Sequence, residues 1–196
     1  MSIDTLAAQL NEIFGPRLRM VAAFGGGGTT SCAVVQNLTL EDLDRCAAHE
    51  PKWNKLGLDA PLFIVERELR RALDAFPLEL NEIIATRRVI AGTDLFADLN
   101  IPKHELRRAC EAQARGHVLH LREAYIEAAG DPREVTKLVA AAVPPFRALV
   151  TNVARLEGIS PKALVTQLNL DNFESDFPGA LRAAEHIVEY VDQWSH

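Results

Sequence analysis

The spacing of apolar residues along the chain changes near residue 100. Before that point, short apolar runs typical of strands alternate with segments of helical periodicity, which indicates an α/β layer. After it, apolar residues recur three or four positions apart over long stretches, which predicts helices. We therefore expect an α+β protein with two domains, a sheet with helices over residues 1–101 and a helical bundle over residues 102–196.

The pattern in the first domain predicts four strands. The expected elements are, in order, a helix over 4–14, strands over 19–24 and 31–36, a helix from Asn37 or Thr39 to about 52–57, a strand over 61–65, a helix over 66–75, a strand over 76–84, and a short helix over 86–91 that Gly92 ends. Because few residues separate the first two strands, we expect them to pair as an antiparallel hairpin. Pro77 favours an edge position for the strand over 76–84.

The second domain is predicted to contain only helices. The expected helices cover 103–129, 131–156 and 160–168, with a last one after Phe177 and Pro178. Pro144 and Pro145 are expected to break or kink the second of them. Helices that follow one another after short connections favour an antiparallel bundle.

A run of four glycines separates the first two predicted strands, in the segment MVAAFGGGGTTSCAVVQ over 20–36. In several α/β folds such a turn binds phosphate, because glycine lets the backbone approach a ligand closely. The run does not match the dinucleotide motif GxGxxG, which from Gly25 would need glycine where Thr30 stands. It also lacks the lysine of a P-loop. A flexible hairpin turn is the alternative interpretation.

Composition and charge narrow the class of protein. The chain has 196 residues, 48% of them apolar, and a net charge of −6. The negative net charge argues against a protein dominated by binding to nucleic-acid backbone. A negative net charge is nevertheless compatible with local basic patches. No apolar run approaches the roughly 20 residues of a membrane helix, and the acidic N-terminus is unlike a signal peptide. Three dispersed cysteines fit buried thiols, so we expect a cytoplasmic protein without membrane contact.

The order of elements resembles that of nucleotidyltransferase-fold proteins of the minimal type, followed by a bundle similar to HEPN domains. The segments PLFIVERELRRALDAFPLELNEI (61–83), RRVIAGTDLFADLNI (87–101) and CEAQARGHVLHLREAYIEAAGDP (110–132) are similar to a bacterial subfamily of nucleotidyltransferase-domain proteins. The resemblance covers roughly residues 5–158. It implies a nucleotidyltransferase-like mixed sheet in the first domain.

The resemblance also implies where an active site would lie. In active members of that fold the first strand leads into a Gly-Ser turn, and the second strand begins with two acids one residue apart. Alternate residues of a strand face the same side, so such carboxylates can hold two Mg²⁺ ions near the nucleotide phosphates. Here the turn falls on Gly25 and Gly26, without the serine, and it is shorter than the family's usual form.

The acids that the resemblance requires are missing from the second strand. They should fall at Ser31 and Ala33, or at Cys32 and Val34, and neither pair contains a carboxylate. A third acid, which the family carries on a later strand, could correspond to Glu79 or Glu82 in the predicted strand over 76–84. One acid cannot assemble a two-metal site, so the resemblance implies the fold and argues against transferase activity.

The predicted helix over 103–129 carries a row of arginines, Arg108, Arg115 and Arg122, opposite its apolar side. Glu111 lies four residues before Arg115, a spacing that favours an ordinary ion pair on a solvated helix face. Leu119 and Ile126 share this face. A second interpretation therefore places the row against the first domain, where the arginines could meet phosphates.

Two weaker patterns lie on the same predicted helix. Arg115 and His120 fit the permissive Arg-x4-His pattern of HEPN-type ribonucleases, for which chance is the better explanation. His117 and His120 have the spacing of metal ligands on a helix, but no third ligand is evident in the sequence, so no metal site is expected.

Together these patterns favour a catalytically degenerate nucleotidyltransferase-like protein that acts as a binding or interaction module. The vestigial candidates for nucleotide binding are Gly25, Gly26, Ser31, Glu79, Glu82, Arg115 and Arg122. No cofactor is expected, and Mg²⁺ with a nucleoside triphosphate is expected only if activity is retained. The expected partner is a second copy or another protein. The alternatives are an active metal-dependent nucleotidyltransferase and a HEPN-type ribonuclease.

Overall fold

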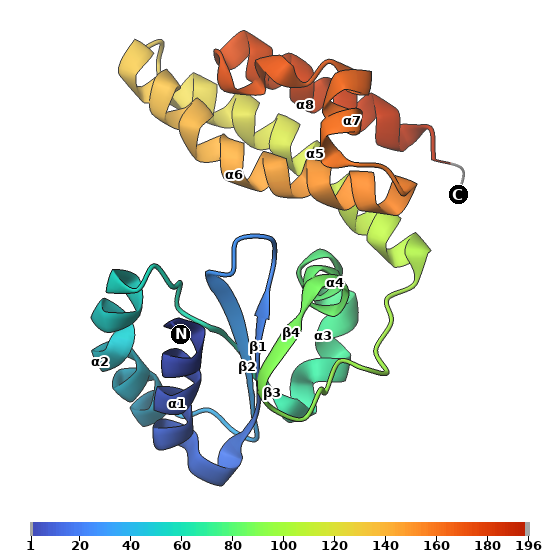
Figure 1. Cartoon of the computed structure of the whole chain (residues 1–196). Coiled ribbons are helices and arrows are strands. Elements are labelled where there is room, and N and C mark those ends of the chain that lie inside the picture. Colours follow the sequence, from blue (N-terminus) through green and yellow to red (C-terminus); the bar gives the residue numbers. More distant parts are fainter. Residues whose placement is uncertain (1, 195–196) are drawn as a thin grey trace. The chain divides into compact units, whose positions relative to one another are not determined.

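The structure is a computed structural model that describes residues 2–194. Contacts within the chain divide it into two compact units, Met1–Ile101 and Pro102–His196. Figure 1 labels the elements of both units. Within the described part of the chain, no helix combines the length and the apolar character needed to cross a bilayer.

The first unit contains a four-stranded sheet and four α-helices. Its elements are α1 (Ser2–Phe14), η1 (Gly15–Arg17), β1 (Leu18–Phe24), β2 (Thr30–Val35), α2 (Leu40–Lys55), β3 (Leu62–Val65), η2 (Glu66–Glu68), α3 (Leu69–Ala75), α4 (Pro77–Thr86) and β4 (Arg88–Gly92). The strand order is β3-β2-β1-β4, and the sheet is mixed. Strand β1 pairs antiparallel with both β2 and β4, whereas β2 pairs parallel with β3. The expected hairpin between the first two strands is confirmed.

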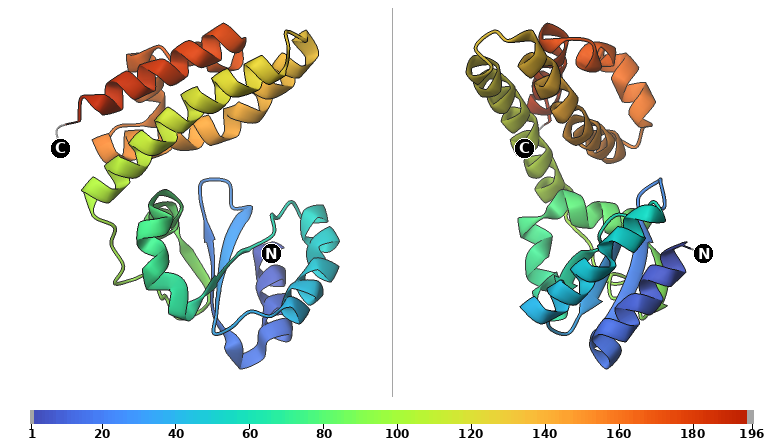
Figure 2. Two further views of the ribbon diagram at one scale, coloured as in Figure 1. Left: turned by 180° about the vertical axis from the view of Figure 1, so that it is seen from behind. Right: turned by 90° about the vertical axis from the view of Figure 1, so that its left-hand side faces the viewer.

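Helices cover both faces of this sheet (Figures 1 and 2). Helices α1 and α2 lie on one face, where one core cluster contains Val21, Ala23, Ala33 and Val35 from the two central strands. The alternate residues, including Met20 and Cys32, face the opposite side, where α3 and α4 lie. Strands buried on both faces explain why 20–23 and 32–35 read as continuous apolar runs.

A buried carboxylate fixes the start of α2. Thr39 is the N-cap, and its hydroxyl accepts a hydrogen bond from the backbone of Asp42 while the Asp42 carboxylate accepts one from the backbone of Thr39. Asp42 is 3% exposed, and Arg17 donates two hydrogen bonds of 2.8 Å to its carboxylate. The capping box and the ion pair therefore join the entry of α2 to the segment before β1.

The structure corrects two predicted elements of the first unit. The segment predicted as a strand over 76–84 is helix α4, with Pro77 at its first position, where a missing amide does no harm. Most of the segment predicted as a short helix over 86–91 belongs to strand β4. Gly92 ends this strand, not a helix, and has φ +80° beside β1. Short apolar runs do not distinguish the two states by periodicity alone.

The second unit is an antiparallel helical bundle. Its elements are α5 (Lys103–Glu127), α6 (Pro132–Glu157), α7 (Pro161–Leu168), η3 (Asp171–Glu174) and α8 (Phe177–Asp192). Helix α5 packs along both α6 and α8 (Figure 2). Helix α6 continues through Pro144 and Pro145 without interruption. Asp131, Ser160 and Asp176 cap the starts of α6, α7 and α8, as their positions before proline-containing first turns favour.

Candidate functional site

Hydrogen bonds within the first unit fix the glycine turn. Phe24 pairs with Thr30 at the end of the hairpin. Gly25 has φ +74°, which glycine adopts readily, and its amide donates a 2.9 Å hydrogen bond to the hydroxyl of Thr86 in α4. The hydroxyl of Thr30 donates to the carbonyl of Phe24 over 2.7 Å. One backbone amide that could meet a phosphate is therefore bound to a side chain of the same unit.

Helix α4, not a strand, brings the predicted third acid to this turn. The Glu82 carboxylate lies 4.0 Å from the position that a Cβ on Gly25 would occupy, whereas Glu79 lies exposed on the same helix. Thr86 donates its hydroxyl proton to the Glu82 carbonyl over 2.7 Å, which links the turn to the end of α4. The placement of Glu79 and Glu82 on a strand is therefore wrong, although Glu82 does lie beside Gly25.

The four positions at which paired acids would stand are all buried in strand β2. Ser31 and Ala33 share one face of the strand, and Cys32 and Val34 share the other. Among the described residues the Ser31 hydroxyl has no hydrogen-bond partner. Burial raises the pKa of the Cys32 thiol to about 11, so this thiol is neutral near pH 7. Neither pair offers a negatively charged ligand.

Strand β4 is a later strand that lies beside β1, where the family's third acid could stand. Its five residues, Arg88–Gly92, include no acid. Arg88 pairs with Ala23 near the hairpin end of β1. Arg87, just before the strand, donates to both oxygens of Asp94 at 2.8 to 3.1 Å. These hydrogen bonds hold the pKa of Asp94 below its usual value.

Sequence patterns missed Thr86, Arg87 and Asp94, because each acts through a partner that only the fold brings near. A threonine at a helix end and an Arg-Asp pair seven residues apart carry no local signal for a turn elsewhere in the chain. Among residues 2–194, no group of three or more histidine, cysteine, aspartate or glutamate side chains converges as a metal site would. At the turn, the Glu82 carboxylate approaches Gly25, the Gly25 amide is bound to Thr86, and the backbone amide of Asp59 donates to the carbonyl of Thr29 over 3.2 Å.

The arginine candidates belong to the second unit, where they bridge α5 and α8. Arg115 contacts Glu111 at 3.2 Å and Asp192 at 2.5 Å. Arg122 contacts Glu185 at 2.7 Å. Each side chain is about half exposed, so these are surface ion pairs whose positive charge is already balanced.

The two histidines of α5 have different surroundings. His117 lies against the ring of Phe146 in an edge-on arrangement, and burial lowers its pKa. The His120 side chain is 82% exposed and lies 3.6 Å from Glu123. Arg115 and His120 are five residues apart on a regular helix, so they point about 140° away from each other. The two side chains therefore do not share one face of α5.

A groove of about 520 Å³ runs between α5 and α8. Its lining residues are Arg115, Val118, Leu119, Arg122, Glu185, Val188 and Glu189. The middle of this groove is apolar, and charged side chains stand on both sides of it. We call this surface the α5–α8 face.

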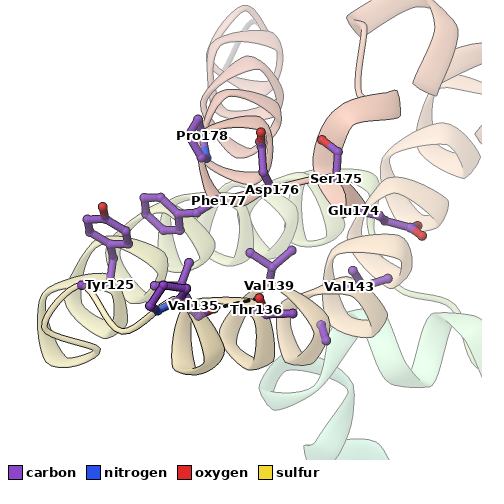
Figure 3. A pocket seen from close by; sticks show the side chains of 13 residues that line it. Tyr125, Val135, Thr136, Val139, Val143, Glu174, Ser175, Asp176, Phe177 and Pro178 are labelled. Atoms are coloured by element: carbon purple, nitrogen blue, oxygen red, sulfur yellow. Dashed lines mark hydrogen bonds between the residues drawn. The ribbon is translucent and has the colours of Figure 1, made fainter.

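A larger groove of about 690 Å³ lies elsewhere on the bundle, between α6 and the start of α8 (Figure 3). The Tyr125 and Phe177 rings stack at its end, with centroids 4.1 Å apart. Its acids are engaged, because Glu174 pairs with Arg147 and Asp176 accepts from the Gly179 amide. The groove therefore offers apolar surface but few polar groups to orient a ligand.

Comparisons with known proteins agree with this architecture at the level of fold. No family model and no curated protein matches the sequence. Among solved structures, a spectinomycin adenyltransferase, AAD(9) from Enterococcus faecialis with ATP and spectinomycin, covers 100% of this chain and 91% of its own, with a TM-score of 0.53 and 11% identity. Identity this low shows the fold alone. The chain therefore has a nucleotidyltransferase-like fold, a mixed sheet with helices followed by an antiparallel helical bundle.

Proposed function

We propose that this chain is a catalytically degenerate nucleotidyltransferase-like protein that acts as a binding or interaction module. Nucleotide binding, if retained, is weak and needs no metal. The bundle is HEPN-like in this proposal, and the protein works in the cytoplasm through protein contacts. The similar adenyltransferase was solved with ATP and spectinomycin. Here we assign neither molecule as a substrate.

The observation that carries this proposal is the character of strand β2. Four consecutive positions, 31–34, hold a serine, a cysteine and two aliphatic residues, all buried. A two-metal site needs carboxylates that project from alternate positions of such a strand. With Ser31 and Ala33, or Cys32 and Val34, in those positions, strand β2 supplies no carboxylate, and Glu82 approaches the turn from α4. A single carboxylate binds Mg²⁺ weakly and cannot activate an attacking hydroxyl at the same time.

The backbone of the turn supports the same proposal. A phosphate at Gly25 would have to displace the hydroxyl of Thr86, which accepts a hydrogen bond from the Gly25 amide and donates one to the backbone carbonyl of Glu82. A triphosphate beside the Glu82 carboxylate would also be repelled by its negative charge. Both effects lower the affinity for nucleotide relative to an open glycine turn.

Calorimetry with ATP in the presence and absence of Mg²⁺ tests the proposal. We expect dissociation constants of about 1 mM or weaker, little changed by Mg²⁺, and no release of pyrophosphate. Micromolar binding that requires Mg²⁺, or pyrophosphate release, would favour the active nucleotidyltransferase instead. Two variants on α4 then provide a matched pair: Glu82→Gln would abolish the activity of such an enzyme, and Glu79→Gln, exposed on the same helix, would leave it unchanged.

A further inference from the structure

The α5–α8 face combines exposed apolar side chains with ordered rows of charge. Leu119 is 63% exposed and Ile126 is 77% exposed, and both share the side of α5 that carries Arg115 and Arg122. Their spacing of three and four residues places them on one helix face. Val188 of α8 lines the opposite side of the groove. Apolar side chains this exposed, rimmed by charge, are typical of an interaction surface.

The two arginines and most of the acids on this face lie on different helices. The α5 side has Arg115 and Arg122, with Glu111 beside Arg115, and the α8 side has Glu185, Glu189 and Asp192. The ion pairs from Arg122 to Glu185 and from Arg115 to Asp192 show that the two helices run antiparallel. They also place Glu189 at a level between the two arginines. Glu189 has no hydrogen bond or ion pair with the described part of the chain.

We propose that the α5–α8 face binds the same face of a second copy of this chain, in a dimer with its two-fold axis parallel to the helices. This inference names the partner for the interaction role proposed above and rests on that proposal. The axis places the basic α5 of one copy over the acidic α8 of the other, in both directions. Glu189 of each copy then faces Arg115 and Arg122 of its neighbour.

The apolar side chains fit the same arrangement. Leu119 and Val188 lie at the same level across the groove, because each is flanked by the two ion pairs that join the helices. Rotation about an axis along the groove places Leu119 of one copy over Val188 of the other. The dimer buries the exposed leucine, with the two arginines before and after it along α5.

The charges also exclude the other two-fold arrangement of the same face. An axis across the helices would place α5 over α5, with Arg115 of one copy against Arg122 of the other. It would also place Glu185 against Asp192. Like charges at close range disfavour such a contact, whereas the axis along the helices brings Glu189 of each copy to the two arginines of the other.

The oligomeric state of the intact chain tests this inference. We expect light scattering at micromolar concentration to give twice the chain mass of 21.6 kDa. Leu119→Glu should raise the dimer dissociation constant on the order of 100-fold. Leu40→Glu, at a residue 74% exposed on α2 of the first unit, is the matched control and should leave the dimer unchanged. A monomeric wild type, or a dimer insensitive to Leu119→Glu, would overturn the inference.

Two charge variants test the direction of the axis and keep the test independent of a core defect. Glu189→Arg should weaken the dimer about tenfold, and added salt should weaken the wild-type dimer. Arg122→Glu should also weaken the dimer if the axis lies along the helices. If the axis lay across the helices, the variant should tighten the dimer, because Arg115 of one copy would face the new glutamate of the other. A tighter Arg122→Glu dimer would therefore contradict the proposed axis. Failure of these tests leaves the calorimetry with ATP unaffected, so the two proposals are separable.

Discussion

The glycine turn and the α5–α8 face both pair polar groups within one unit, but they differ in the residues that lie beside those pairs. At the turn, the Gly25 amide and the Thr30 hydroxyl are bound within the first unit, and the β2 positions that follow are buried. On the α5–α8 face, Arg115 and Arg122 stand at the surface, about half exposed, beside exposed Leu119. The comparison teaches that the polar pairs at the turn adjoin buried strand positions, whereas those on the α5–α8 face adjoin an apolar side chain that is open to solvent.

The same contrast predicts where the chain tolerates substitution. The sheet unit depends on a few buried or closely approaching groups, such as Asp42 at the start of α2 and Gly92 at the end of β4. The bundle holds its charged pairs at the surface, where each contributes little to stability. Substitutions in the sheet unit should therefore have large effects on folding, and those on the bundle surface small ones.

Gly92→Ala should have the largest effect. A Cβ on Gly92 would overlap the backbone carbonyl of Arg19 in the neighbouring segment, and φ +80° is unfavourable for any side chain. The atoms that this Cβ would meet belong to the backbone of Arg19 and Met20 and not to a flexible side chain, so β1 and β4 would have to separate. We expect the free energy of unfolding of the first unit to fall by about 4 kcal/mol, measured by urea denaturation followed through the buried Trp53 in a Trp194→Phe background.

Gly26→Ala is the control for this prediction. No atom lies within 4 Å of a Cβ on Gly26, and its φ is not in the left-handed region. Its stability should change by less than about 0.5 kcal/mol. Equal effects of the two substitutions would show that β4 does not approach β1 as closely as described.

Gly92 also illustrates what the sequence could and could not predict about the fold. The hairpin, its antiparallel pairing and the helices of the bundle follow from apolar spacing and from proline and glycine at their ends. The prediction for 76–91 was wrong because its apolar runs are short: Ile83 and Ile84 favour a strand where the structure has a helix, whereas 86–91 was predicted as a helix although Val89 and Ile90 favour a strand. Tertiary contacts decide such segments: β4 is a strand because β1 offers it an open edge.

The residue types of the candidate site could be read from the sequence, but the contacts around the turn could not. Residue types at 31–34 already show that no carboxylate pair stands in β2. The contacts of Gly25 with Thr86 and of Glu82 with the turn join residues about sixty positions apart. No local pattern encodes them, because they depend on how α4 packs against the end of β1.

Asp42→Ala should have the second largest effect. It removes both the capping box of α2 and the ion pair with Arg17, and Asp42 is almost fully buried. We expect a loss of about 3 kcal/mol in the stability of the first unit. Glu41→Ala, at an exposed neighbouring residue in the same helical turn, should change stability by less than about 0.5 kcal/mol.

The pH dependence of stability gives a second readout at Asp42. Hydrogen bonds from Arg17 hold the pKa of Asp42 well below its ordinary value of 3.8. The unfolded chain therefore binds this proton at a higher pH than the folded chain does. Its contribution to stability is complete above pH 3.8 and is lost as the pH falls toward the folded pKa. Asp42→Asn should flatten this part of the profile, and an unchanged acid limb would argue against the ion pair.

Protonation of His117 in the bundle should have the smallest effect on stability. Burial against α6 lowers its pKa below 6.5, so the unfolded chain takes up a proton there before the folded bundle does. The stability of the second unit should therefore decrease slightly as the pH falls below about 6.5, whereas that of the first unit, measured through Trp53, should not follow this titration. Hydrogen exchange of α5 and α6 peptides measures the change.

His117→Gln should remove this pH dependence and His120→Gln, at an exposed residue of the same helix, should keep it. If both variants behaved alike, the His117 side chain would have to be as accessible as that of His120, and the bundle would be looser at α6 than its packing indicates.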